Sequence, residues 1–349
     1  MAISAIDSIT PALEHTKQQL FKPFHIGQWT KLAFVGLLAG ELGSSSFSRS
    51  NFTFPQRHGG PSHLDIPNIP SADLALIGAI VAVGIVAAIA IGIILMYVSS
   101  VMRFVLFDSI LLRECHIRWS WTRRLGAGWR YFVWKLIYLV LLFTGVGVLL
   151  GAPLAFAIAS RWYNDPKAHL VPLVLGGACI FIVFFSFFMV TAVVFVLTKD
   201  FVVPQMALEN LTATEGWRRL WTMMKAEKGA YASYVVMKIV LAIVAAVLVA
   251  IAALIVGLVY VVPTAGLSLL AILTGKAAGM TWNVETITLA VAVGIILLGI
   301  FLYLVSLVSV PVIVFFPAYS MYFFADRYPR LKAALNPALP PPGTAPVSP

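Results

Sequence analysis

The sequence predicts an all-α integral membrane protein with six transmembrane helices, arranged as three parallel helix-hairpin repeats. Each hairpin is expected to follow a cytoplasmic amphipathic helix that lies in the membrane interface. Three observations predict this fold class: long apolar stretches without charges, basic residues confined to alternate connections, and short motifs that recur in one order. The composition agrees, because only 11% of the residues are charged, whereas soluble domains carry about 25%.

Five apolar stretches are each long enough to cross a bilayer, which takes roughly 18 to 20 residues in a helix. They run from Leu74 to Met102, from Tyr131 to Ser160, from Leu170 to Thr198, from Tyr231 to Val262 and from Thr286 to Tyr319. A soluble core helix is rarely so long, and the part between Leu136 and Ser160 contains no acidic, basic or histidine residue. These stretches predict a protein that resides in a membrane.

The distribution of basic residues predicts the orientation. Nineteen of the 24 Lys and Arg residues fall in the N-terminal segment, residues 103–135, residues 199–238 and the C-terminal segment, which leaves five for the other connections. Cytoplasmic segments carry the excess of Lys and Arg in membrane proteins. Both termini are therefore predicted to be cytoplasmic, and the expected location is the cell (inner) membrane.

This orientation requires a sixth crossing, between Phe24 and Gly43. That span is the weakest, because it contains Lys31 and an apolar core that covers only Leu32 to Gly40. Trp29 and Lys31 would anchor its inner end, and Glu41 would lie at the outer interface. The alternative is a re-entrant or interfacial segment, since the apolar core is shorter than a bilayer requires.

The chain is expected to form a single membrane domain over residues 1–335, followed by a Pro-rich disordered tail over residues 336–349. The predicted repeat units cover about residues 1–102, 103–198 and 199–319. The motif Arg123-Arg124-Leu125 resembles Arg218-Arg219-Leu220, and Lys31, Lys135 and Lys238 stand near the start of the three outgoing helices. Two crossings per unit give all copies one orientation, as in parallel repeats. Convergence on a general pattern of charges before an apolar helix is the alternative.

The clearest amphipathic segment opens the third unit. Thr212 and Glu215 are spaced as a capping box at the start of a helix. Helical spacing then predicts one apolar stripe, beside Arg218 and Arg219, that consists of Trp217, Leu220, Trp221 and Met224. Such a helix is typical of the membrane interface, with indoles at headgroup depth and cations near lipid phosphate.

Aromatic and basic side chains of the cytoplasmic surface are predicted to contact lipid headgroups, and the basic ones favour anionic lipid. These candidate interface residues are Trp121, Arg123, Arg124, Trp129, Lys135, Trp217, Arg218, Arg219, Trp221 and Lys238. An aromatic belt that only anchors the protein is the simpler interpretation, and a docking platform for a protein partner is the other. Nucleic acid is not expected as a partner, because the positive charge follows the membrane boundaries.

Small residues recur every four positions on two of the predicted spans. Gly84, Ala88 and Gly92 form one such face, and Gly147 and Gly151 begin another. Faces of this kind let helix backbones approach closely. They predict a packed bundle, with a seam between identical copies as the alternative.

No motif of the sequence indicates catalysis. There is no phosphate-binding glycine loop, no histidine pair with zinc spacing on a helix, and no serine in a nucleophile elbow. The spans also lack the acidic and histidine residues that ion-coupled transporters use. We therefore expect a non-enzymatic protein without cofactor or metal, which acts as a lipid- or partner-binding scaffold or accessory protein. A transporter of lipid or another amphiphile is the alternative, since an apolar substrate needs no buried charge.

The chain resembles a group of uncharacterised prokaryotic multi-pass membrane proteins. The resemblance lies in Asp108 to Arg130, in Phe201 to Lys238, in the opening Ala5-Ile6-Asp7, and in Trp29, Lys31 and Leu32 before the first span. That group is similar to the membrane domain of bacterial glycerophosphodiester phosphodiesterases. Those enzymes carry a separate catalytic barrel with acidic metal ligands, and no part of this sequence matches it. The resemblance therefore implies a membrane domain without the phosphodiesterase activity.

Overall fold

The computed structural model describes residues 4–41, 71–160, 170–277, 279 and 283–336, and nearly all of them are helical. The long helices are α3 (Ser71–Leu111), α4 (Ile117–Ala159), α5 (Leu170–Leu197), α8 (Lys228–Ala277) and α9 (Val284–Val308). The shorter helices are α1 (Ile9–Phe21), α2 (Ile26–Leu38), α6 (Val203–Glu209), α7 (Ala213–Ala226), α10 (Val310–Ala325) and α11 (Pro329–Leu335). One π-helical turn, η3 (Thr198–Val202), joins α5 to α6. The predicted tail at residues 336–349 lies outside the described residues apart from Asn336.

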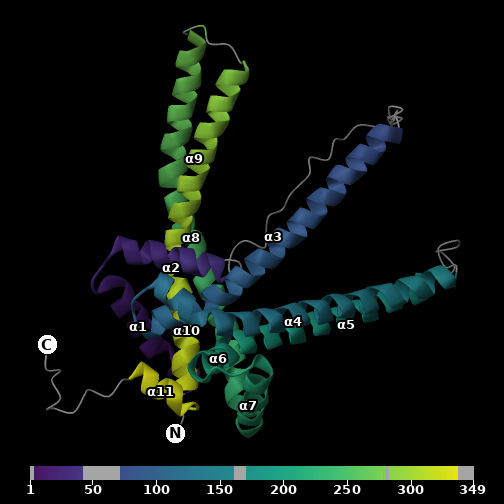
Figure 1. Cartoon of the computed structure of the whole chain (residues 1–349), viewed down its shortest axis with the longest axis vertical. Coiled ribbons are helices and arrows are strands. Elements are labelled where there is room, and N and C mark those ends of the chain that lie inside the picture. Colours follow the sequence, from purple (N-terminus) through teal and green to yellow (C-terminus); the bar gives the residue numbers. More distant parts are fainter. Residues whose placement is uncertain (1–3, 42–70, 161–169, 278, 280–282, 337–349) are drawn as a thin grey trace.

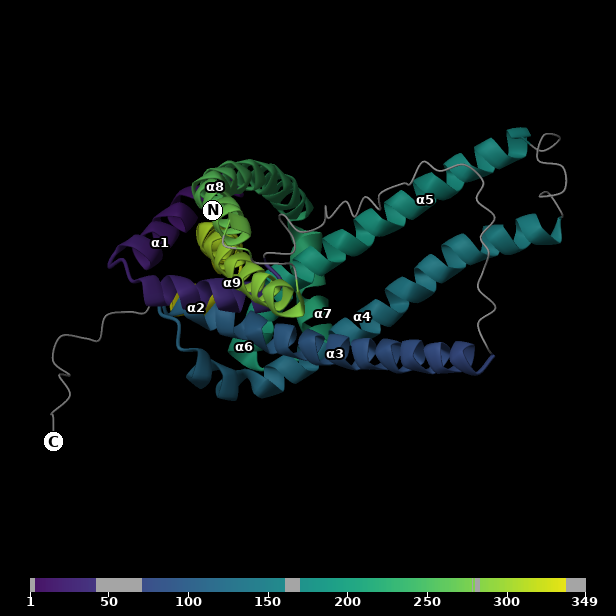
Figure 2. The same cartoon turned by 90° about the horizontal axis from the view of Figure 1, so that it is seen from above.

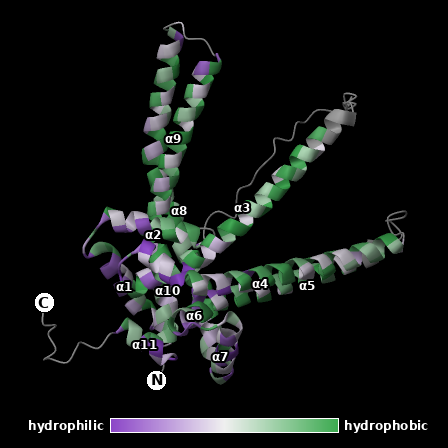
Figure 3. Cartoon of the chain, viewed as in Figure 1, coloured by the Kyte–Doolittle hydropathy of each residue, from purple (hydrophilic) through white to green (hydrophobic). Residues whose placement is uncertain are grey.

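The molecule consists of a base and three arms (Figure 1). The base contains the short helices and the ends of the long helices that meet them. One arm is α3, the second is the α4–α5 pair and the third is the α8–α9 pair. Seen from above, α3, α4 and α5 extend to the same side of the base, whereas α8 and α9 rise separately (Figure 2). Hydrophobic residues cover the arms, and hydrophilic residues gather in the base (Figure 3).

An aromatic cluster forms the core of the base. The ring of Phe201 lies 4.9 to 5.8 Å from the rings of Tyr231, Tyr234, Phe323 and Phe324, measured between centroids. These rings come from η3, α8 and α10, so the cluster joins elements that are more than 100 residues apart in the chain. Buried aromatic pairs at these distances stabilise a core by more than their buried area alone.

The arms bury almost none of their apolar surface. Five helical segments are long and apolar enough to cross a membrane: residues 78–111, 117–159, 174–209, 228–277 and 284–325. No residue is buried in the most apolar 18-residue window of the α3, α4 and α9 segments, and 6% are buried in the other two. Soluble proteins rarely expose apolar patches of this extent, so the structure supports a membrane protein.

The sixth crossing is not confirmed among the described residues. Helix α2 covers 13 residues and is about 20 Å long, which is too short to span the hydrocarbon core. It ends before Gly40, whose φ of 80° is a left-handed conformation that favours glycine. The predicted outer position of Glu41 is wrong, because Glu41 is buried in the base, where it pairs with Arg103 and Lys199. An interfacial α2 fits these observations.

Two expectations about the amphipathic segments need correction. The segment with Trp121 and Trp129 is not a separate helix, because α4 continues without a break from Ile117 into the apolar arm. Helix α7 is a separate helix, and the Thr212 hydroxyl accepts a hydrogen bond from the Glu215 amide at its start, as the capping motif predicts. Its apolar stripe is divided, however: Leu220 is fully buried in the protein core, whereas Trp221 is exposed.

Cysteine labelling would test this arrangement of the chain. In a background with Cys115 and Cys179 replaced by Ala, we expect Lys276→Cys at the tip of an arm to react with an impermeant thiol reagent from outside. Ala226→Cys, Ala333→Cys and Ala39→Cys should react only after the membrane is opened, because all three lie in or beside the base. Labelling of Ala39→Cys from outside would show that α2 crosses the bilayer.

A buried histidine attaches α1 to the base. His15 is 2% exposed, with Nε2 3.0 Å from the Ile110 carbonyl oxygen and Nδ1 3.2 Å from the Tyr322 hydroxyl. The carbonyl can only accept, so Nε2 carries the proton and Nδ1 accepts from Tyr322. Burial lowers the pKa of His15, the charge of Arg113 lowers it further, and the hydrogen bond to the Ile110 carbonyl opposes the shift. The folded protein therefore favours the neutral imidazole.

Acid should weaken this attachment. As pH falls below about 6.5, the unfolded chain protonates His15 before the folded protein does, so the stability contributed by neutral His15 is lost towards its lower folded pKa. We expect the midpoint of thermal unfolding in detergent to drop between pH 7.5 and 5.5. A His15→Gln variant keeps a donor for Ile110 and should show a smaller drop. An equal drop in both proteins would assign the pH dependence to other groups.

Candidate functional site

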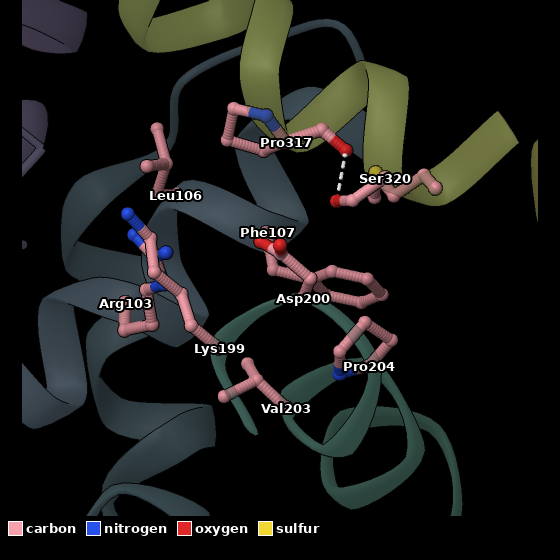
Figure 4. A pocket seen from close by; sticks show the side chains of 10 residues that line it. Arg103, Leu106, Phe107, Lys199, Asp200, Val203, Pro204, Pro317 and Ser320 are labelled. Atoms are coloured by element: carbon pink, nitrogen blue, oxygen red, sulfur yellow. Dashed lines mark hydrogen bonds between the residues drawn. The ribbon is translucent and has the colours of Figure 1, made fainter. Parts of the chain in front are cut away.

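A small cavity marks the place where three separate parts of the chain meet. Its polar lining consists of Arg103 from α3, Lys199 and Asp200 from η3, and Ser320 from α10 (Figure 4). Its volume of about 20 Å³ is enough for one water molecule. The cavity is therefore too small for an organic substrate, and the charged side chains around it are the feature that needs explanation.

The π-helical turn delivers two adjacent charges to this region. A π-turn inserts one extra residue into a helix and often occurs at functional positions. Here it covers Thr198–Val202, and Pro204 follows near the start of α6, where a missing backbone donor costs little. Lys199 and Asp200 both lie within the turn, yet they bind partners from different helices. The turn thus places opposite charges side by side in the base.

The first ion cluster is built on Glu41. Its carboxylate accepts from the guanidinium of Arg103 and from the ammonium group of Lys199, which come from α3 and η3. The three side chains are between 6% and 15% exposed. A buried charge is costly unless it is paired and hydrogen-bonded, and these contacts meet that requirement. The cluster ties the chain after α2 to two long helices.

The second ion cluster is built on Asp200. The carboxylate of Asp200 is 3% exposed and accepts from the Lys238 ammonium group of α8. It also accepts a hydrogen bond of 2.9 Å from the Tyr234 hydroxyl. The Tyr234 ring stacks on the Tyr319 ring of α10, with 5.3 Å between centroids. Asp200 thereby links η3 to α8 and, through the stacked rings, to α10.

One further ion pair and one further lysine extend the network. Asp108 at the end of α3 accepts two hydrogen bonds from Arg124 of α4, at 2.6 and 2.8 Å. Lys135 of α4 lies 3.3 Å from the Ser99 hydroxyl of α3 and 5.6 Å from the ring centroid of Tyr131. Bidentate arginine–carboxylate pairs are among the strongest polar contacts. These two contacts hold α3 and α4 against each other next to the connection that joins them.

The structure divides the ten predicted lipid-contact residues into two groups. The residues that bind other parts of the protein are Arg124, Lys135, Lys238, Arg219 and Trp217. Each side chain of this group has a partner inside the protein, and its headgroup contact stays a prediction. The residues whose side chains are exposed are Arg123, Trp129, Arg218 and Trp221, while Trp121 is half-buried. Only this second group presents the expected aromatic and basic surface.

Sequence reasoning missed the acidic members of the network. Glu41 binds partners 62 and 158 residues away, and Asp200 binds a partner 38 residues away. No local spacing rule joins positions so far apart. One signal was present: Arg103 stands in an otherwise apolar run, and Lys199 and Asp200 follow an apolar span directly. Charges next to spans usually have a partner inside the protein.

The chemistry of the network is that of a structural junction. Three cations, Arg103, Lys199 and Lys238, share the two carboxylates of Glu41 and Asp200. Across the described part of the chain, no group of three or more His, Cys, Asp or Glu residues could hold a metal ion. Each of these cations is paired with a carboxylate, and the pairs fix the relative positions of α3, η3 and α8.

Removal of the central carboxylate should destabilise the base strongly. Asp200→Asn leaves the Lys238 ammonium buried without its anion, a change that typically costs about 3–5 kcal/mol. Glu215→Gln is the matched control, because its pair with Arg219 is 3.6 Å long and 37% exposed and should contribute less than about 1 kcal/mol. Thermal unfolding in detergent would compare them. A double variant, Asp200→Asn with Lys238→Met, should recover part of the loss, and failure to recover would contradict a charge-pair origin.

The comparisons with known proteins identify one family and name no activity. A family model described as a family of unknown function (DUF7544) matches residues 3–334. No curated protein matches the chain, and no solved structure matches it. The match shows no relation to the glycerophosphodiester phosphodiesterases. Because it covers most of the 349 residues, the chain belongs to the DUF7544 family of unknown function.

Proposed function

We propose that this protein is a non-enzymatic membrane scaffold that binds lipid or a membrane-protein partner between its arms. The observation that carries the proposal is the contrast between a tightly paired base and arms that bury at most 6% of their most apolar windows. In this proposal the base lies at the cytoplasmic face of the cell membrane, with both termini cytoplasmic, and the arms cross the bilayer. The excess of basic residues in the base supports this orientation.

The small-residue faces of the arms support the binding of another helix or of lipid. A Cβ atom built on Gly84, Gly92, Gly147 or Gly151 would meet no atom within 4 Å. These faces therefore do not pack the arms against one another, contrary to the expectation of a packed bundle. Close helix approach in a membrane depends on such surfaces, and in this protein they are available to a second molecule.

Transport of an amphiphile is the second candidate, and one observation favours it. A largely apolar cavity of about 400 Å³ lies between α8 and α9 near the tip of their arm. Its lining includes Ile272, Leu289, Val293 and Leu297, and Lys276 at the rim adds a charge. A cavity of this size and lining suits an acyl chain. Transport would also require a path along the arm, which the cavity alone does not provide.

The experiment that tests the scaffold compares two double variants of α4. Gly147→Leu with Gly151→Leu fills the small-residue face, whereas Val148→Leu with Ala152→Leu adds bulk one residue further round the same exposed helix. We expect the first variant to lose about tenfold of the co-purifying partner or of the enriched lipid, by close-contact packing, and the second to keep it. The readout is mass spectrometry of protein and lipid after extraction in native nanodiscs.

Two results would contradict the scaffold. The first is an unmodified protein that carries only bulk-composition lipid and no reproducible partner or second copy. The second is movement of labelled lipid across proteoliposomes, which would identify the protein as a transporter.

A further inference from the structure

A second, larger cavity opens beside the base, away from the ion clusters. It has a volume of about 630 Å³ and lies between the α1–α2 connection and the α3–α4 connection. Its polar lining includes Gln18, Lys22, Gln28, Lys31, Arg113 and His116. A neighbouring cavity of about 600 Å³ shares Lys31 and His116 and adds Arg118. The two together could admit a lipid headgroup, which is far beyond what the small central cavity can hold.

The charge in this cavity is strongly positive. Within the described part of the chain, no carboxylate lies within 4.0 Å of the cationic atoms of Lys22, Lys31 or Arg113. Glu114 is the acidic residue of the lining, and its carboxylate lies 2.9 Å from Nε2 of His116. In the ion clusters Arg103, Lys199, Lys238 and Arg124 each have a carboxylate partner, whereas Lys22, Lys31 and Arg113 are exposed. Three cations without a carboxylate partner, around a single cavity, match the chemistry of a bound anion.

The fold holds one of these cations in place at a conformational cost. Arg113 has a φ of 58°, in the left-handed region where a non-glycine residue costs about 1–2 kcal/mol. Its guanidinium donates to the Gln18 side-chain oxygen at 2.9 Å, and Gln28 donates to its carbonyl oxygen at 2.9 Å. Glycine would satisfy this turn more easily. The arrangement instead presents an oriented guanidinium to the cavity.

One residue of the cavity lining, Gln19, also has an unsatisfied polar atom. Gln19 is 4% exposed and donates to the Ser109 carbonyl oxygen, but its own side-chain oxygen has no hydrogen-bond partner. A buried acceptor without a partner costs free energy, and it would be satisfied by a hydroxyl or ammonium donor. Phospholipid headgroups carry such donors next to their phosphate. Gln19 therefore points to a ligand that offers both a donor and a negative charge.

Apolar side chains are exposed at and near the rim of the cavity. Leu112 lines it, Trp119 lines the neighbouring cavity, and each is 50% exposed. Phe21, Phe24 and Ile26 are sequence neighbours of lining residues and are also more than 50% exposed. A soluble phosphate compound would gain nothing from this rim. A lipid would place its acyl chains along these side chains and its headgroup among the cations. The combination favours an amphiphile.

We propose that this basic cavity binds the phosphate headgroup of an anionic phospholipid. The phosphate oxygens accept from Lys22, Lys31 and Arg113, and a headgroup hydroxyl donates to the Gln19 side-chain oxygen. The proposal rests on the lipid-binding form of the proposed function and names its lipid class. It differs from the predicted lipid surface, because none of these residues belongs to the ten expected contacts.

The test compares charge removal inside and outside the cavity. One variant combines Lys22→Gln, Lys31→Gln and Arg113→Gln. The matched control combines Lys17→Gln, Lys225→Gln and Lys228→Gln, which removes the same charge from exposed positions that line neither cavity and are not among the ten predicted contacts. The full-length protein in detergent is titrated with phosphatidylglycerol, with phosphatidylcholine or with inorganic phosphate. Binding is followed by native mass spectrometry, and thermal unfolding checks that each variant folds.

We expect the cavity variant to lose at least about tenfold in phosphatidylglycerol affinity, because each charged hydrogen bond contributes substantially. The control should change by less than about twofold, because its lysines line neither cavity and contribute only a screened, general attraction. If Arg113→Gln prevents folding, two variants replace the triple variant. We expect Lys22→Gln with Lys31→Gln to lose phosphatidylglycerol binding and Arg113→Lys to keep it.

Three outcomes would overturn the proposal. Equal losses in both variants would reduce it to general attraction to anionic surface. Equal affinity for phosphatidylcholine would remove the anionic specificity, and displacement of lipid by millimolar inorganic phosphate would identify a site for a soluble phosphate. The α4 glycine variants leave this cavity intact. If the cavity experiment contradicts the headgroup site while the α4 variants behave as expected, this inference alone is wrong. If the α4 variants contradict the scaffold while the cavity variant loses phosphatidylglycerol binding as expected, the scaffold alone is wrong.

Discussion

The base of this protein depends on carboxylates that are shared between cations from separate helices. Glu41 joins Arg103 and Lys199, and Asp200 joins Lys238 and the Tyr234 hydroxyl. A buried pair of this kind is weak evidence for added stability, since desolvation offsets much of the attraction. Such pairs instead favour one arrangement of the helices, because any other arrangement would leave a charge buried without its partner. The pairs therefore define which helix ends meet and in which register, and the aromatic cluster around Phe201 packs within that frame.

The arrangement of the arms depends on the base and on the medium that surrounds the arms. In water, their exposed apolar surfaces would drive the helices together, but in lipid the acyl chains are as apolar as the side chains, and that force disappears. The base thus determines where each arm begins, and the membrane together with any bound molecule determines how closely the arms approach. The arms diverge from the base in Figure 1, and spanning helices commonly tilt away from the bilayer normal.

The sequence predicts some of this structure well, and the reason is local chemistry. Long uncharged stretches identified the five candidate spans because a spanning helix satisfies its own backbone and needs no distant partner. The capping contact of Thr212 was predictable for the same reason. The internal partners of the charged residues were not predictable in this way. A rule that assigns every Lys and Arg to the membrane surface cannot distinguish Arg124, which binds Asp108, from Arg123, which is exposed beside it. The distinction depends on tertiary contacts, as does the burial of Glu41, and a single sequence contains no record of them.

The same distinction separates charges that build the fold from charges that are free to act on another molecule. The net charge of +10 means that the carboxylates cannot neutralise every cation. The pairs with Asp108 and Asp200 and the Glu41 cluster use Arg124, Lys238, Arg103 and Lys199, and each of these cations is paired inside the protein. The surplus is not spread evenly, because three of its members surround one cavity at the edge of the base. Like charges held close together repel one another, so their gathering opposes folding unless an anion joins them. A membrane surface supplies anions at high local concentration. Anionic lipid is therefore the natural partner for the unpaired cations around this cavity.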